Sequence, residues 1–441
     1  MTVPALERWE AAAAAPREFD SVVGARSRWR DNRVPARPGW PITVVIVGLP
    51  LWWVLGLSHF VWQLAAVPMA VTLVRSRNLR VPAGFGVWLL FLAWVLVSAV
   101  TLDGSIERFV SYGFYAVNWF TASIWFVYVY NLRDGRFSVG RATRLFFGFW
   151  LMVVAGGFAG LVLGDREFGT VMEHLVPELI LANDLGADLF HIHFAQTQDF
   201  LGFPVPRPSA PFVYTNEWAA ALVYLTPFVP LMWRRVGVWG AGLMPTVTGL
   251  ALIPIVISLN RGLWLSTVVA LVYVAARRTW SGDPRVLLTT VVVVVIVGVT
   301  VLTTPLSTFV AGRALSDHSN EARASLYSAV IEDVADSPML GYGAPLSNER
   351  EPLRPAVGTH GQFWLVLFSY GIPGAILFTW FLGQVAWRTG RGDLSGDRLW
   401  LHLVPVLVLV AMWFYQIETA QLHVVFVALA LALREQAEGA Q

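Results

Sequence analysis

Twelve long apolar runs alternate with polar connections along the chain. A transmembrane helix needs about 20 mostly apolar residues, and fewer where neighbouring helices help. The pattern therefore predicts an all-α polytopic membrane protein with about twelve transmembrane helices. The predicted spans are 42–57, 60–73, 83–102, 112–132, 145–163, 212–233, 237–259, 263–276, 286–302, 363–381, 399–413 and 417–433.

One apolar stretch, 237–276, is interrupted only by Asn260 and Arg261. As a single helix it would be about 60 Å long, roughly twice the thickness of the bilayer core. It is therefore predicted to form two spans that meet in a turn at Asn260, Arg261 and Gly262. This turn places an arginine at the edge of the membrane.

Every second connection between the predicted spans is basic because arginines cluster there, and the alternate connections are not basic. Arginine-rich connections face the cytoplasm, so both termini are expected there. The predicted organisation is a cytoplasmic tail (1–41), a transmembrane domain (42–434) and a short cytoplasmic tail (435–441). Two long outer loops, 164–211 and 303–362, are where function is expected.

The composition supports a membrane protein and excludes several kinds of chemistry. The chain is 56% hydrophobic and 14% charged, whereas about a quarter of the residues of a soluble protein are charged. All 31 basic residues are arginine and cysteine is absent, which excludes lysine Schiff bases, disulfides and thiolate sites. Segment 1–37 lacks the apolar region of a cleaved signal peptide. No Walker loop is present, which argues against an ATP-driven pump.

The second outer loop carries candidate catalytic groups. Its residues Glu321 to Val330 are predicted to be helical, and the Ser-Pro-Met-Leu-Gly-Tyr-Gly stretch at 337–343 breaks that helix. The loop then holds Arg354 and closes with His360 at the start of a span. Histidine has a pKa of about 6.5 and can transfer protons, while arginine binds phosphate oxygens in a bidentate manner. These residues predict proton transfer beside a bound anion.

The order of these motifs resembles the O-antigen ligase and polymerase superfamily. In the ligases a histidine and a polar residue precede Gly-x-x-Gly at a spacing that His360, Gly371 and Gly374 keep. Gly361 stands where the ligases carry the polar residue, and Gln362 follows it. Two further stretches are similar to family motifs: the segment from Arg207 to Trp218, and Ser-Leu-Asn-Arg-Gly at 258–262. The resemblance covers 207–417 and implies a GT-C-like fold.

The resemblance also implies a reaction and roles for individual residues. The family transfers a glycan from a polyprenyl diphosphate carrier to a hydroxyl acceptor, here at the outer face of a bacterial cytoplasmic membrane. It makes His360 the general base, with Arg261 and Arg323 binding the diphosphate. The reaction would invert the anomeric carbon without a metal or nucleotide cofactor. The implied substrate contacts are Arg207, Asn216, Tyr327, Tyr342, Arg354 and Gln362.

Structural roles are also open for these residues when each is taken alone. His360 could be a packing histidine at the membrane boundary, Arg261 could extend to the lipid headgroups, and Arg323 could pair with Glu321 or Asp317. His191 and His193 would share one face of a strand. Together with the nearby acidic side chains, they are candidate metal ligands. Their spacing matches no strong zinc motif, so a solvated acidic loop is favoured.

Two other functions compete with the ligase hypothesis. A polymerase of the same superfamily would use another carrier-linked repeat unit as acceptor, whereas a ligase would use a distinct glycan, glycolipid or protein. A transporter or flippase of lipid-linked glycans would need ionisable groups near the middle of the membrane, where Glu217 and Glu418 are the main candidates. The expected partners are the carrier-linked glycan, its acceptor and membrane lipids, with no nucleic acid.

Overall fold

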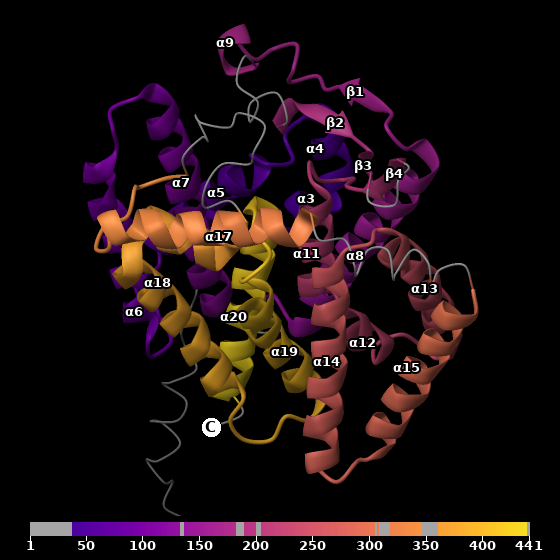
Figure 1. The fold of residues 1–441 in the computed structure, drawn as a ribbon. Coiled ribbons are helices and arrows are strands. Elements are labelled where there is room, and N and C mark those ends of the chain that lie inside the picture. Colours follow the sequence, from indigo (N-terminus) through magenta and orange to yellow (C-terminus); the bar gives the residue numbers. More distant parts are fainter. Residues whose placement is uncertain are drawn as a thin grey trace, which may run out of the picture. The chain divides into compact units, whose positions relative to one another are not determined.

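The apolar runs form helices in the structure, a computed structural model. It describes residues 38–132, 136–181, 189–199, 204–304, 307, 318–345 and 360–438. Gly39–Gln441 form one compact unit, and the description that follows is of this unit. Figure 1 shows its helices surrounding α20 and α19.

Every predicted span coincides with a helix or with two consecutive helices. The first half contains α3 (Trp40–Val47), α4 (Leu49–Leu55), α5 (Val61–Val74), α6 (Phe85–Ser98) with the 3₁₀ turn η1 (Ala99–Thr101), α7 (Ile106–Asn131) and α8 (Val139–Leu163). The second half contains α11 (Thr215–Leu225), α12 (Phe228–Trp233), α13 (Val238–Ile257), α14 (Arg261–Trp280), α15 (Arg285–Thr303), α18 (Gln362–Thr389), α19 (Gly396–Ala411) and α20 (Thr419–Glu438).

Only part of the twelve-span prediction is confirmed. Within the described ranges, three helices are long and apolar enough to cross a membrane: Val139–Leu163, Val238–Ile257 and Gln362–Thr389. Some of the other predicted spans form shorter or divided helices. The run 42–57 divides at Gly48, with Pro50 in the first turn of α4, and the run 212–233 divides near Pro227. Proline is tolerated in the first turn of a helix but interrupts a helix interior, so it favours such divisions.

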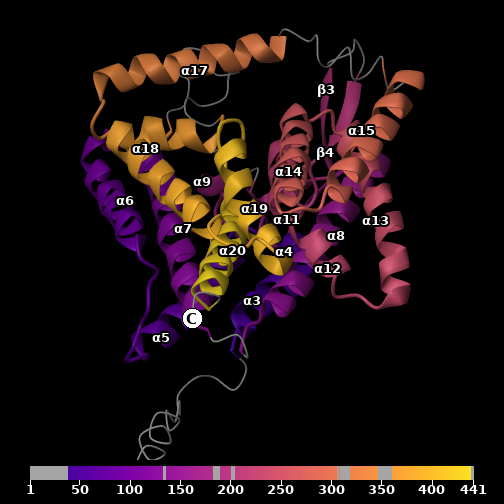
Figure 2. The ribbon, with the colours of Figure 1, turned by 90° about the horizontal axis from the view of Figure 1, so that it is seen from below.

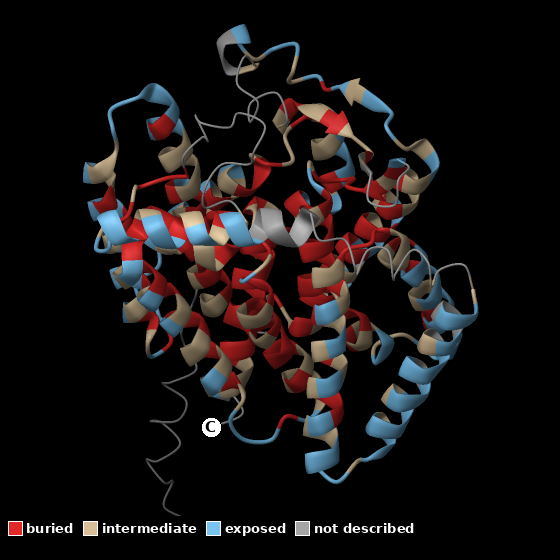
Figure 3. Cartoon of the chain, in the orientation of Figure 1, coloured by how far each residue is buried: buried red, intermediate tan, exposed pale blue. Residues whose placement is uncertain are grey.

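Large apolar side chains are exposed along several of these helices. On α13 to α15 the exposed set includes Leu243, Leu265, Val272, Leu288 and Val295, and Figure 3 shows α15 with mainly exposed residues. Helices α11, α19 and α20 are instead buried along most of their length. Extended exposed apolar surface is unfavourable in water and is typical of helices that meet lipid.

The first predicted outer loop contains two short antiparallel hairpins, which the all-α prediction missed. β1 (Glu167–Gly169) pairs with β2 (His191–His193), and β3 (Ala195–Asp199) pairs with β4 (Pro204–Pro208). A short helix, α9 (Glu178–Leu181), lies between the strands of the first hairpin. In the second hairpin Gln196 is opposite Arg207, so β4 presents this motif arginine from a paired strand.

The second predicted outer loop contains the helix that the sequence predicted, in a longer form. This helix, α17 (His318–Asp336), packs against α18 and lies in front of it in Figure 1 and above it in Figure 2. Val330 and Val334 on α17 pack with Phe368 of α18. The helix ends before Pro338, as predicted, because proline and two glycines follow.

Candidate active site

The predicted turn between α13 and α14 is present, and it places Arg261 at the first position of α14. Leu259 has a left-handed φ of 52°, which is unusual for a side chain with a branched γ-carbon. Asn260 caps α14, because its Oδ1 accepts from the Leu263 backbone N–H over 3.4 Å. Arg261 therefore lies at the positive end of a 20-residue helix dipole, where anions are favoured.

Two residues expected to contact substrate lie against this turn. Arg207 is buried, and its Nε donates to the Ser258 carbonyl oxygen over 2.8 Å while Nη1 donates to Gln198 Oε1 over 2.6 Å. Asn216 Oδ1 accepts from Asn260 Nδ2 over 3.2 Å. In this structure both side chains support the segment that carries Arg261.

His360 is half-buried and is followed by Gly361 and Gln362, at which α18 begins. Gly361 has a φ of +118° and packs closely on the Trp413 carbonyl oxygen. Gln362 is buried, and its Oε1 accepts from the Ile417 backbone N–H over 2.7 Å. The side chain of Gln362, expected to contact substrate, is thus bonded to the α19–α20 connection, residues 412–418.

The α19–α20 connection joins the two elements that carry His360 and Arg261. A Cβ on Gly361 would lie 2.7 Å from the Trp413 carbonyl oxygen, and one on Gly262 would lie 2.7 Å from Tyr415 Oη. Gly361 follows His360 and Gly262 follows Arg261, so the immediate neighbours of both residues pack on the stretch 413–415. These contacts explain why glycine occupies both positions.

Helix α17 meets the same connection. Tyr327 Oη donates to the Trp413 carbonyl oxygen over 3.3 Å, and the Tyr327 ring stacks on Trp364 at 4.5 Å between centroids. Arg323 belongs to the same helix and precedes Tyr327 by four residues. Arg354 lies outside the described residues.

The turn after α17 inserts at a break in α18. Gly371 has φ 66° and ψ −171° inside α18, which leaves nearby carbonyl groups without helical partners. The backbone N–H groups of Tyr342 and Gly343 donate to the carbonyl oxygens of Phe368 and Ser369 over 3.0 and 2.7 Å. A Cβ on Gly371 would lie 2.5 Å from the Met339 carbonyl oxygen. The first glycine of the Gly-x-x-Gly motif is therefore required by this docking.

Tyr342 is held on this turn rather than extended into solvent. Its ring stacks on Phe368 at 4.8 Å, and its hydroxyl donates to the Asp333 carbonyl oxygen over 2.9 Å. Burial, with added repulsion from Asp333 and Asp336, raises the pKa of the Tyr342 hydroxyl above its usual value. The hydroxyl therefore stays protonated, and one ring face is already occupied.

Arg108, which the sequence reasoning missed, fixes the turn from the other side. It is buried at the start of α7 and donates from Nη1 to the carbonyl oxygens of Ala344 and Pro345, each over 2.8 Å. Its Nη2 donates to the Tyr342 carbonyl oxygen. A lone arginine beside a predicted span gave no sequence signal beyond its charge.

A small cavity lies next to these elements and contains two acidic residues. Its volume is about 20 Å³, and it is lined by His59, Glu217, Glu418 and Gln421 among other residues. Such a volume can hold one water molecule. Burial lowers the pKa of His59 to about 4, so this imidazole is neutral near pH 7.

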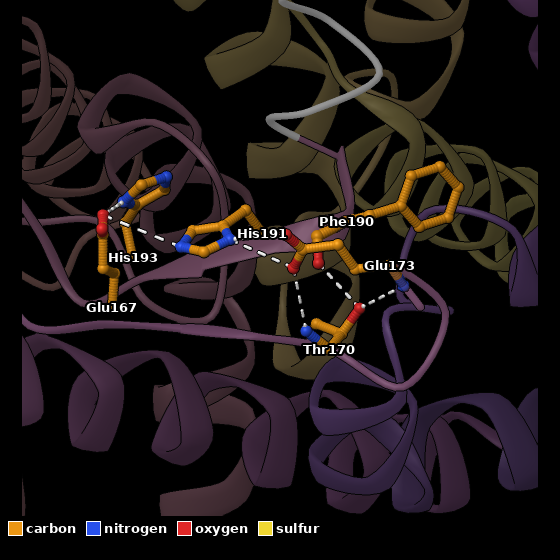
Figure 4. A network of polar contacts seen from close by, with 6 residues as sticks. All are labelled: Glu167, Thr170, Glu173, Phe190, His191 and His193. Carbon is orange, nitrogen blue, oxygen red and sulfur yellow. Dashed lines mark hydrogen bonds and ion pairs between the residues drawn. The ribbon is translucent and has the colours of Figure 1, made fainter. Parts of the chain in front are cut away.

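The histidines of the first outer loop form a separate polar network (Figure 4). His191 Nδ1 lies 3.1 Å from Glu173 Oε2, and His193 Nδ1 lies 3.2 Å from Glu167 Oε2. Both histidines lie on β2, as their spacing suggested. Among the described residues no group of three or more His, Cys, Asp or Glu side chains is arranged to hold a metal ion.

Residues 246–379 match the O-antigen ligase family model. The match confirms the predicted resemblance to the O-antigen ligase and polymerase superfamily over this segment, which contains Arg261, Arg323 and His360. No curated protein sequence shows a significant match to the chain. The matched segment covers less than a third of the chain, and it overlaps two of the three helices that are long and apolar enough to cross a membrane.

The O-antigen ligase match leaves part of the site outside its bounds. Arg207 and Asn216 precede residue 246, and the α19–α20 connection follows residue 379. The segments outside the match nevertheless contact the turn before Arg261 and the start of α18. The site therefore depends on regions that the family model does not cover.

Proposed function

We propose that the protein is an integral-membrane glycosyltransferase that moves a glycan from a polyprenyl diphosphate carrier to a hydroxyl acceptor. The observation that carries this proposal is the shared packing of Gly361 and Gly262 on residues 413–415. It brings the segments of His360 and Arg261 onto one connection, within a chain whose 246–379 segment matches the O-antigen ligase model.

In the proposed reaction the acceptor oxygen attacks the anomeric carbon of the donor glycan. His360 takes the acceptor proton as the new carbon–oxygen bond forms and the bond to the diphosphate breaks. The anomeric configuration inverts, and the lipid diphosphate leaves with its bonding electrons. Since a diphosphate is already a good leaving group, this scheme uses neither a nucleotide cofactor nor a metal.

Cations at the leaving diphosphate complete the scheme. Arg261 stands at the N-terminus of α14, so its guanidinium and the helix dipole act on the same developing negative charge. Arginine stays protonated at physiological pH and matches the geometry of phosphate oxygens. Arg323 on α17 is proposed as the second cation.

A groove on the apolar surface suits the lipid of the donor. It has a volume of about 660 Å³ and lies between α14 and α15, with Val272, Ala276, Trp280, Val291 and Val294 in its lining. Helix α14 links this groove to Arg261 at the helix start. We infer that the polyprenyl chain follows α14 into the groove while the diphosphate stays near Arg261.

The proposed orientation has both termini in the cytoplasm and the site at the outer face of the cytoplasmic membrane. The arginine-rich connections support it, since they include Arg277, Arg278 and Arg285 at the α14–α15 turn. Arg261 at the other end of α14 then faces outward. The acceptor would be a glycan, a glycolipid or a protein.

A polymerase of the same superfamily is the second candidate, because its chemistry uses the same groups. A transporter is supported less well. The cavity that Glu217 and Glu418 line has a volume of about 20 Å³, which is the size of one water molecule. A sugar is many times larger.

The decisive experiment measures glycan transfer in proteoliposomes that contain polyprenyl-diphosphate oligosaccharide and candidate acceptors. Transfer to a distinct acceptor that is lost in His360→Ala supports a ligase, whereas a ladder of extended carrier-linked products indicates a polymerase. Equal transfer by His360→Ala and wild type would refute the catalytic role of His360. The variant His174→Ala, at an exposed histidine of the first loop, is the matched control.

A further inference from the structure

The α19–α20 connection contains one residue that is bonded to both halves of the site. Tyr415 is buried, and its Oη donates to Asn260 Oδ1, immediately before Arg261. Its carbonyl oxygen accepts from the Gln362 backbone N–H over 2.8 Å, two residues after His360. One residue thus bonds to the start of α14 through its side chain and to the start of α18 through its backbone.

Asn260 is the point through which Tyr415 acts on the arginine turn. Its Oδ1 accepts from both Tyr415 Oη and the Leu263 N–H, while its Nδ2 donates to Asn216 Oδ1. Both ends of the carboxamide are therefore fixed. The preceding Leu259 holds a left-handed φ of 52°, a conformation that persists only when surrounding contacts enforce it.

The second link of Tyr415 is equally specific. Gln362 donates its backbone N–H to Tyr415, and its side-chain Oε1 accepts from the Ile417 N–H. The Phe363 N–H donates to the Met412 carbonyl oxygen over 2.9 Å. The first N–H groups of α18 thus find their partners in the α19–α20 connection instead of in water, which fixes the start of α18.

We propose that Tyr415 is a positioning residue, which holds the turn that carries Arg261 at a fixed position relative to His360. The proposal rests on the glycosyltransferase function proposed above and adds a residue outside the segment that matches the O-antigen ligase model. Tyr415 does not contact the reacting atoms. It acts by fixing Asn260, and a displacement of about 1 Å between catalytic groups can lower a rate about a hundredfold.

The first test removes only the hydroxyl group. In Tyr415→Phe we expect kcat for glycan transfer to fall about tenfold or more, with KM for the donor changed less than twofold. The matched control is Tyr224→Phe, because Tyr224 is also a fully buried tyrosine and its hydroxyl has no hydrogen-bond partner among the described residues. The thermal unfolding midpoint of each variant, measured in the same detergent, reports any general loss of folding.

The second test measures the distance between α14 and α18 and needs no activity assay. The chain has no cysteine, so Leu265→Cys on α14 and Ile376→Cys on α18 allow two spin labels at exposed positions. Double electron–electron resonance should give one narrow distance distribution in this background and in the Tyr224→Phe background. We expect a broadened or shifted distribution with Tyr415→Phe.

The proposal requires both results. An unchanged kcat in Tyr415→Phe overturns it, and so does a lower kcat with an unchanged distance distribution, since the hydroxyl would then act in another way. If the wild type transfers no glycan, the proposed function fails. The distance measurement still decides whether Tyr415 fixes α14 relative to α18.

Discussion

Arg207 donates from Nε to the carbonyl oxygen of Ser258 over 2.8 Å, so a strand of the first loop supports the turn before Arg261. The two residues are 51 positions apart in the chain. The family resemblance implies that Arg207 contacts substrate, but in this structure its side chain bonds to the protein backbone. The contact therefore distinguishes a structural role for Arg207 from the substrate-binding role that the motif suggests.

Arg207→Ala is expected to lower the free energy of unfolding by about 2–4 kcal/mol, because the buried Ser258 carbonyl oxygen and the half-buried Gln198 Oε1 lose this donor. Arg207→Lys should recover little of this loss, since an ammonium group lacks the planar fork that reaches both Ser258 and Gln198. Chemical or thermal unfolding in detergent measures the effect, with Arg166→Ala at an exposed position as control. A raised donor KM at unchanged stability would instead restore the substrate-contact role.

Gly262→Ala is expected to abolish most transfer activity. The new Cβ would lie 2.7 Å from Phe414 Cδ2 and from Tyr415 Oη, so the α19–α20 connection would have to move away from α14. Overpacking of this kind destabilises by about 1–3 kcal/mol. Gly242→Ala on α13, where no atom lies within 4 Å of the new Cβ, is the control. Wild-type kcat and stability in Gly262→Ala would contradict the packing described here.

Val291→Trp is expected to fill the groove between α14 and α15 and to raise the KM for a full-length polyprenyl donor at least fivefold, an effect of about 1 kcal/mol. A donor with a lipid too short to enter the groove should be unaffected. Val292→Trp provides the control, because Val292 is the next residue on α15, is exposed, and does not line the groove. If both tryptophan variants change KM equally, the lipid does not occupy this groove.

His59 is expected to make the fold sensitive to acid. Its pKa is about 4 in the folded protein and about 6.5 in an unfolded chain. Below about pH 6.5 the unfolded chain binds a proton that the folded protein does not, so stability falls as the pH drops toward 4. The loss is at most about 3 kcal/mol.

The pH dependence of the unfolding midpoint between pH 7 and pH 4.5 tests this prediction. His59→Asn should show a shallower decrease than the wild type, since asparagine does not titrate. His174→Asn, at an exposed histidine, should follow the wild-type curve. Identical slopes for the wild type and His59→Asn would show that burial of His59 does not contribute.

Hydrophobic periodicity predicted the helices well because long apolar runs have few alternatives. It also placed the turn at Asn260 correctly, since an uninterrupted helix would have exceeded the bilayer thickness. It did not predict the division at Gly48 or the hairpin that presents Arg207. Both depend on local backbone geometry and strand pairing, which hydrophobicity does not encode.

The sequence predicted only part of the candidate site, because motifs identify some of its residues and long-range hydrogen bonds determine the others. His360 and Arg261 were identified by motif, and the structure brings their neighbours Gly361 and Gly262 onto one stretch of chain. Tyr415 and Arg108 were missed, because each acts through hydrogen bonds to backbone or amide groups more than 100 residues away. Nothing in the residue type or spacing of either one points to such a partner.

The dependence of the site on residues 412–418 also sets an order for biogenesis. A nascent chain that has completed α18 already contains His360, Arg261 and Arg323, yet it lacks the segment to which the starts of α14 and α18 are bonded. We expect the proposed catalytic groups to reach their final relative positions only after the ribosome has delivered α19 and α20. Partly synthesised copies of the protein in the membrane would then not react prematurely with the carrier-linked glycan.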